Sequence, residues 1–166
     1  QQTVWGIKDT GTYPISNPRS TMSRLTTTEN TSTNVRSISC ATNCTTNDGW
    51  YSDLPLSDER VNVDMKLQLG TLVVASNIPS NNACSIGGIS YLSFFDARNG
   101  LQVPGSAQFG SKLSDSLAVG INVVRLPDGR TVVIATTSDA SQTTQETPIP
   151  PGNPMGRRTS WRELVQ

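Results

Sequence analysis

The residues that could carry chemistry in this sequence are acidic side chains and cysteines, because the chain contains no histidine. Without histidine it cannot form a Ser-His-Asp or Cys-His arrangement of its own. Asp58 and Glu59 fall at an expected turn, and Asp64 falls on the polar face of an alternating segment, where solvated charges are usual. A carboxylate pair for glycoside hydrolysis is the alternative. The pattern favours a non-enzymatic protein with no catalytic residue.

Cysteine spacing predicts one disulfide. Cys40 and Cys44 lie in the polar segment SCATNCTTNDG, where an oxidising compartment would join them through a short loop. Two reduced thiols in a cytosolic loop are the alternative. Zinc is disfavoured, because no histidine and no second cysteine pair completes a tetrahedral set. Cys84 is either a lone buried thiol or the partner of a group outside this chain.

Calcium could bind at loops rich in amides and carboxylates, such as Asn47-Asp48 or Asp96–Asn99. Both loops are better explained as turns in which these side chains bond their own backbone. We therefore expect no metal and no cofactor in this chain.

The composition excludes several classes of partner. The 166 residues contain 13 Lys+Arg and 13 Asp+Glu, so no basic stripe favours nucleic acid or an anionic membrane. Charged residues make up 16% of the chain, and Ser, Thr and Asn supply the polarity that is typical of a secreted or cell-surface β-protein. No apolar run reaches the ~18 residues of a membrane span. The N-terminus has neither a signal peptide nor an initiator Met, which suggests processing or a longer parent chain.

Short strands must position these side chains, because no stretch has a convincing helical period. Over residues 61–69 apolar and polar residues alternate without a slip, which predicts a half-buried strand. Residues 72–75 are apolar on both faces and predict a central strand. Further strands are expected at 5–8, 35–39, 49–54, 91–96, 117–126 and 131–137.

This pattern predicts an all-β antiparallel meander with long polar loops, as in a sandwich, a barrel or a propeller. Residues 49–96 would make one four-stranded unit and residues 117–137 half of another. An incomplete unit at a chain end favours a partial, modified β-propeller that contributes the C-terminal blades. Its exposed strand edges would be completed by another chain or by an upstream segment.

Three regions are expected along the chain. Residues 1–48 hold a strand and a long Ser/Thr/Asn-rich loop region, in which residues 12–34 form a surface connection with one short strand near 22–25. Residues 49–137 form the main β-meander. Residues 138–166 form a Pro-rich linker and a C-terminal docking segment.

Aromatic residues at the strand corners have two interpretations. They could form a ligand platform or anchor the corners of the sheet, and we favour anchors: Trp5, Trp50, Tyr51 and Trp161. A buried Trp or Tyr needs a partner for its polar hydrogen, and Asp53 and Arg60 are candidates that would pair across the turn between them. A Glu59–Arg60 pair at the rim would add little stability.

Motifs in a fixed order resemble the C-terminal part of the PilY-type type IV pilus tip and assembly proteins. Each motif is weak alone, but their order covers most of the chain. The motifs are Trp5-Gly6, Gly49-Trp50-Tyr51-Ser52-Asp53-Leu54, Glu59-Arg60-Val61, Pro79…Cys84…Gly87-Gly88 and Ser160-Trp161-Arg162.

The resemblance implies a modified β-propeller in a secreted bacterial protein at the pilus tip, the outer membrane or the cell surface. It implies roles in pilus biogenesis and adhesion, with pilus minor subunits and a host-surface receptor as partners. The family's calcium loop precedes the Trp-Gly corner, so calcium is expected elsewhere in the full-length protein and not on these residues.

The C-terminal arginines Arg157, Arg158 and Arg162 either contact an acidic partner or fasten the C-terminus onto the domain, with Trp161 filling a pocket. Two other functions stay open for the whole chain. One is a propeller-type oxidoreductase domain whose catalytic residues lie upstream. The other is a stand-alone secreted carbohydrate-binding β-domain.

Overall fold

The computed structural model describes residues 1–9, 11, 15–44, 48–81 and 87–149. Nearly all of its regular structure is strand. The elements are β1 (Thr3–Ile7), α1 (Pro18–Thr21), β2 (Ser23–Asn30), β3 (Val35–Thr42), β4 (Gly49–Asp53), β5 (Lys66–Gln68), β6 (Thr71–Pro79), β7 (Gly88–Asp96), β8 (Gly110–Ser114), β9 (Ala118–Arg125), β10 (Thr131–Thr137) and β11 (Gln142–Glu146). The all-β prediction is confirmed.

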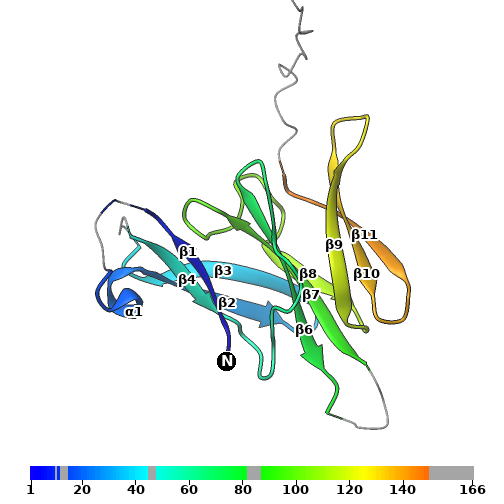
Figure 1. The fold of residues 1–166 in the computed structure, drawn as a ribbon, viewed down its shortest axis with the longest axis horizontal. Helices are drawn as coiled ribbons and strands as arrows, with labels where there is room; N and C mark the ends of the chain where they lie inside the picture. Colours follow the sequence, from blue (N-terminus) through cyan, green and yellow to red (C-terminus); the bar gives the residue numbers. More distant parts are fainter. Residues whose placement is uncertain (10, 12–14, 45–47, 82–86, 150–166) are drawn as a thin grey trace, which may run out of the picture.

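The strands form two sheets (Figure 1). The larger sheet curls and has eight strands in the order β1-β4-β2-β3-β8-β7-β6-β5, and the smaller has the order β11-β10-β9. Neighbouring strands are antiparallel except β2 and β4, which run parallel. The meander prediction therefore fails at this pair. It holds for β5 to β8, which are consecutive in the chain and in the sheet.

Two apolar clusters lie on opposite faces of β6 and β7. Val73, Leu92 and Phe94 point into the first cluster, which residues from β9 and β10 complete. Val74 and Phe95 point the other way, into a second cluster with Trp50. Because successive strand residues face opposite sides, β6 is buried on both faces, as its apolar sequence predicted.

The prediction of one regular strand over residues 61–69 is wrong. Only β5 is strand there, and Val61 and Val63 pack against different clusters. Side chains two apart share a face only in extended backbone, and the backbone before β5 is irregular. Met65, Leu67 and Leu69, which were expected to face a core, are exposed.

Two strands, β8 and β11, were missed, because their sequences carry few apolar residues. The short strand expected near 22–25 is present as β2, which is longer and buries alternate side chains. β8 lies between the expected strands at 91–96 and 117–126, where no strand was predicted. β11 has the polar sequence QTTQE, forms an edge, and replaces part of the expected linker at 138–166.

The strands expected at 117–126 and 131–137 are confirmed as β9 and β10, which pair as an antiparallel hairpin. The expected four-stranded unit over residues 49–96 is not formed. β4 lies between β1 and β2, and β6 lies between β5 and β7. β4, which carries Gly49-Trp50-Tyr51, and β5, the next strand along the chain, therefore lie in opposite halves of the larger sheet.

Candidate functional site

The Gly-Trp corner is built by close approach of β1 to β4. Gly6 faces Trp50 across the two strands, and a Cβ on Gly6 would lie 2.3 Å from the indole ring. Gly49 has φ 122°, and a Cβ there would lie 2.1 Å from the Gly6 carbonyl oxygen. Glycine is therefore required at both positions. The close approach of the two strands at these glycines leaves room for the Trp50 indole in the core.

Trp50 is 2% exposed and stacks on Phe95 at 5.1 Å between ring centroids. Its indole N–H donates to the Ala97 carbonyl oxygen at 3.2 Å. A buried indole whose polar hydrogen is satisfied by backbone has no free face for a ligand. Trp50 therefore lies in the second apolar cluster, as an anchor would.

The opposite face of β4 carries a small aromatic and charged cluster. Tyr51 stacks on Trp5 at 4.9 Å, and the Arg19 guanidinium lies 5.1 Å from the Tyr51 ring centroid. The Tyr51 hydroxyl donates to the Arg19 carbonyl oxygen at 3.0 Å. Trp5 and Arg19 also line an open depression beside α1. In this cluster an exposed cation, Arg19, lies over two aromatic rings.

Asp53 fixes Arg19 over the two rings. Its carboxylate accepts from both Arg19 terminal nitrogens, at 2.9 and 3.1 Å, and from the Thr3 hydroxyl at 2.6 Å. The hydrogen bond from Arg19 holds the pKa of Asp53 below its usual range. The expected pairing of Asp53 with Arg60 is wrong, because Arg60 is exposed and its backbone instead bridges to Asn77.

A buried ion network joins β2, β3 and the segment before β5. Arg36 and Glu59 are each 1% exposed and form two hydrogen bonds, at 2.7 and 3.0 Å. Glu29 accepts from Arg36 at 3.3 Å and from the Tyr91 hydroxyl at 2.8 Å. Ser76 also donates to Glu59. The expectation of a solvated Glu59 at the rim is therefore wrong.

Tyr91 closes this network from β7. The Arg36 guanidinium lies 3.6 Å from the Tyr91 ring centroid. Burial and the hydrogen bond to Glu29 raise the pKa of Tyr91 to about 12. The network has no access to a substrate, since its charged atoms are buried, and it fastens two halves of the larger sheet together.

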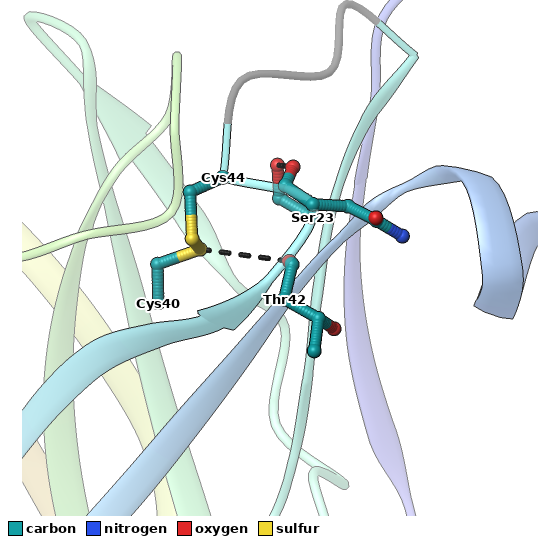
Figure 2. Close-up of a disulfide and its surroundings, with 5 residues drawn as sticks. Ser23, Cys40, Thr42 and Cys44 are labelled. Atoms are coloured by element: carbon teal, nitrogen blue, oxygen red, sulfur yellow. Dashed lines mark hydrogen bonds between the residues drawn. A yellow bond between two sulfur atoms is a disulfide. The ribbon is translucent and has the colours of Figure 1, made fainter.

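The predicted disulfide between Cys40 and Cys44 is confirmed (Figure 2). It links the end of β3 to the segment that leads into β4, and the Cys40 sulfur lies 3.6 Å from the Thr42 carbonyl oxygen. The disulfide lines a cavity of about 230 Å³ that also reaches Trp50 and Arg98. The bond therefore restrains the entry to the Gly-Trp corner.

The exposed apolar side chains concentrate on the β5–β6 hairpin. Leu67 is 65% exposed, Leu69 53% and Met65 47%. β5 is the last strand of the larger sheet, and no described strand pairs with its outer side. Large exposed apolar groups at an open sheet edge are typical of a protein-binding surface.

Among the described residues, no cluster of three or more metal-ligating side chains occurs. Asp96, one of the residues considered for calcium, instead accepts two hydrogen bonds from the Arg98 side chain, at 2.7 and 3.0 Å. Arg98 also holds the pKa of Asp96 below its usual range. The arrangement at this turn is an ion pair.

Other predicted residues fall at different places. Gly87 lies directly before β7 and Gly88 begins it, where a Cβ on Gly88 would lie 2.2 Å from the Ile78 carbonyl oxygen. The remaining residues lie outside the described part of the chain: Asn47, Cys84, Arg157, Arg158, Trp161 and Arg162. Sequence patterns carried no signal for Arg19, Glu29 or Arg36, each of which has a hydrogen-bond partner more than 20 residues away in the chain.

Comparisons with family models, curated proteins and solved structures give no match to this chain. Within the described ranges, the structure contains no helix with the length and hydropathy that a membrane crossing requires.

Proposed function

We propose that this chain is a non-enzymatic binding segment of a secreted protein that acts in type IV pilus assembly and surface attachment. The observation that carries the proposal is the exposure of Leu67 on the edge strand β5, with exposed Met65 and Leu69 directly beside it in the chain. Such a surface suits contact with another polypeptide, whereas the charged residues of the buried network are already paired with one another.

The motifs that resemble the PilY-type proteins support this proposal, because they converge in space. Trp5 and Gly6 face Tyr51 and Trp50 across β1 and β4, although they lie more than 40 residues apart in the chain. The disulfide supports a secreted location at the bacterial cell surface, since such bonds persist in oxidising compartments.

The partial β-propeller is part of the same proposal. Strands β5 to β8 form a four-stranded antiparallel meander, which is the arrangement of one propeller blade. The remaining blades would come from an upstream segment or another chain. Pilus minor subunits and a host-surface receptor are the partners that the resemblance implies, and calcium would bind elsewhere in the full-length protein.

The two other functions have less support. A carbohydrate-binding site at Trp50 has no accessible ring face, because this side chain is 2% exposed and stacked on Phe95. An oxidoreductase would draw its catalytic residues from upstream, and no feature of the described residues favours it.

The proposal is tested in the bacterium that carries the gene, by deleting residues 1–166 in frame and counting surface pili by electron microscopy. We expect pili and adhesion to fall strongly and to return with the intact gene. A complementing gene with Leu67→Lys should restore the protein but only part of the adhesion. Normal piliation and adhesion in the deletion strain would refute the proposed function.

A further inference from the structure

The β5–β6 hairpin has one covered face and one open face. Lys66 pairs with Val73, which points into the first apolar cluster beneath β9 and β10. Leu67 pairs with Leu72, which packs against the second cluster. Residues opposite each other on paired strands point to the same side. Leu67 therefore extends the second cluster outward, past the point where the described residues cover it.

The outer edge of β5 also offers backbone hydrogen-bonding groups. Gln68 and Thr71 close a hairpin whose two loop residues, Leu69 and Gly70, have φ 49° and 81°. Positive φ at both positions is characteristic of a type I′ turn, whose closing pair is hydrogen-bonded. Pairs alternate in an antiparallel ladder, so the N–H and C=O of Leu67 point away from β6 toward the open edge.

Leu69 is a second unusual feature of this edge. A bulky side chain at positive φ is strained, and Asn or Gly is the usual residue in such a turn. Leu69 also exposes 53% of its surface. A strained and exposed leucine at a hairpin tip gains nothing in the isolated chain, which indicates that its side chain is used in contact with another molecule.

We propose that β5 pairs with β5 of a second copy of this chain, antiparallel about a two-fold axis at Leu67. This inference rests on the proposed binding role of the β5 edge and names its partner. In this register Leu67 faces the partner's Leu67 and Lys66 faces the partner's Gln68, while Met65 and Leu69 lie at the two ends of the paired segment.

The register is self-complementary. Leu67 meets Leu67 of the second copy on the open face, and no like charges oppose each other within β5. The outward N–H and C=O of Leu67 exchange two hydrogen bonds with those of the second copy, as in any hydrogen-bonded antiparallel pair. A shift of the axis to Lys66 would place two ammonium groups opposite each other. The charge pattern disfavours that axis, and the outward backbone groups of Leu67 select this residue as the centre.

The size of the surface predicts a weak dimer. Stable interfaces bury about 1,200–2,000 Å² in total, and three side chains with a short stretch of backbone on each copy fall below this range. We therefore expect a reversible, concentration-dependent dimer of the isolated chain. If several copies were held close together on the cell surface, a larger fraction of them would be dimeric.

The first test is a disulfide at the two-fold axis. In a Cys84→Ser background, Leu67→Cys places two thiols across a hydrogen-bonded pair with Cα atoms about 5.5 Å apart, a distance that suits a disulfide. Copper-phenanthroline oxidation should give a covalent dimer on non-reducing gels within minutes. Val119→Cys, which alters a residue on β9 that is 59% exposed, is the matched control and should remain largely monomeric.

The second test is sedimentation equilibrium of the unsubstituted chain and of the Leu67→Lys variant. The unsubstituted chain should dimerise with concentration, and Leu67→Lys should raise the dissociation constant by at least about tenfold, because two ammonium groups would face each other. Circular dichroism verifies that the variant is folded. A monomeric unsubstituted chain, or equal crosslinking of both cysteine variants, would overturn the dimer.

Failure of the dimer and failure of the proposed function give different results. If the chain is monomeric but Leu67→Lys still lowers adhesion of the bacterium, the edge binds another protein and only the second copy is refuted. If Leu67→Lys changes neither association nor adhesion, the binding role of the edge is refuted as well.

Discussion

Replacing Arg36 by Met should destabilise the protein strongly without changing its surface. Arg36 is 1% exposed and donates to Glu59 at 2.7 and 3.0 Å and to Glu29 at 3.3 Å. Without the guanidinium both carboxylates remain buried with no cation between them. Removing one partner of a buried ion pair costs about 3–5 kcal/mol. With a urea m-value of about 2 kcal/mol/M, the unfolding midpoint should fall by roughly 2 M.

The assay is equilibrium urea unfolding followed by tryptophan fluorescence. The double variant Arg36→Met/Glu59→Met should be more stable than Arg36→Met alone, since it removes a buried carboxylate together with its cation. If Arg36→Met fails to fold, Glu59→Gln gives a milder version of the same loss. Arg130→Met, at an exposed ion pair with Asp128, should change the midpoint little. Equal midpoints for Arg36→Met and Arg130→Met would refute the buried network.

Three further predictions concern the corner, the disulfide and acid stability. Trp50→Ala should lower the free energy of unfolding by about 3–5 kcal/mol, measured by urea, because it removes a buried ring; a neutral effect would contradict its role as an anchor. Cys40→Ser/Cys44→Ser should lower it by about 2 kcal/mol from loop entropy, measured the same way; unchanged stability would contradict this. The lowered pKa of Asp53 contributes stability above its unfolded pKa of about 3.9, and this is lost as pH falls through the lower folded pKa. Asp53→Asn should therefore flatten the stability curve between about pH 5 and pH 2, and an unchanged curve would contradict the ion pair.

Sequence reasoning located strands where apolar content was high. The apolar run at residues 72–75 became part of β6, buried on both faces, and the hairpin of β9 and β10 followed from its turn residues. The polar strand β2 was predicted too short and β11 was missed, because half of their side chains or more face solvent or an open edge. The polarity of these two strands reflects their position in the sheet, which cannot be inferred from the residues of the strand alone.

The alternation over residues 61–69 gave the strongest prediction and the largest error. The pattern predicts a face that is covered, while the structure leaves Met65, Leu67 and Leu69 exposed. The alternation shows that a segment has an apolar face that could be buried. It does not show whether the surface that buries this face belongs to the same chain. The mismatch supports the proposal that another polypeptide covers the β5 edge.

The candidate site was predicted unevenly for a related reason. The disulfide joins residues four apart and could be read from spacing. Arg36 pairs with Glu59, which lies 23 residues away in the sequence, and Arg19 pairs with Asp53, which lies 34 residues away. Such pairs depend on which strands become neighbours, and the parallel pairing of β2 with β4 has no local signal. Asp53 was therefore assigned the nearby Arg60 instead of the distant Arg19.

Photo-crosslinking at position 67 on the living cell tests the central claim most directly. A benzophenone amino acid at Leu67 in the full-length protein should, on irradiation, give covalent products in the sheared surface fraction that contains the pili. The same group at Val119, on β9, is the matched control and should give much less product. Recovery of a second copy or a pilus subunit at position 67 is the expected result. A protein that is absent from the surface fraction, or that crosslinks equally from both positions, would contradict the account.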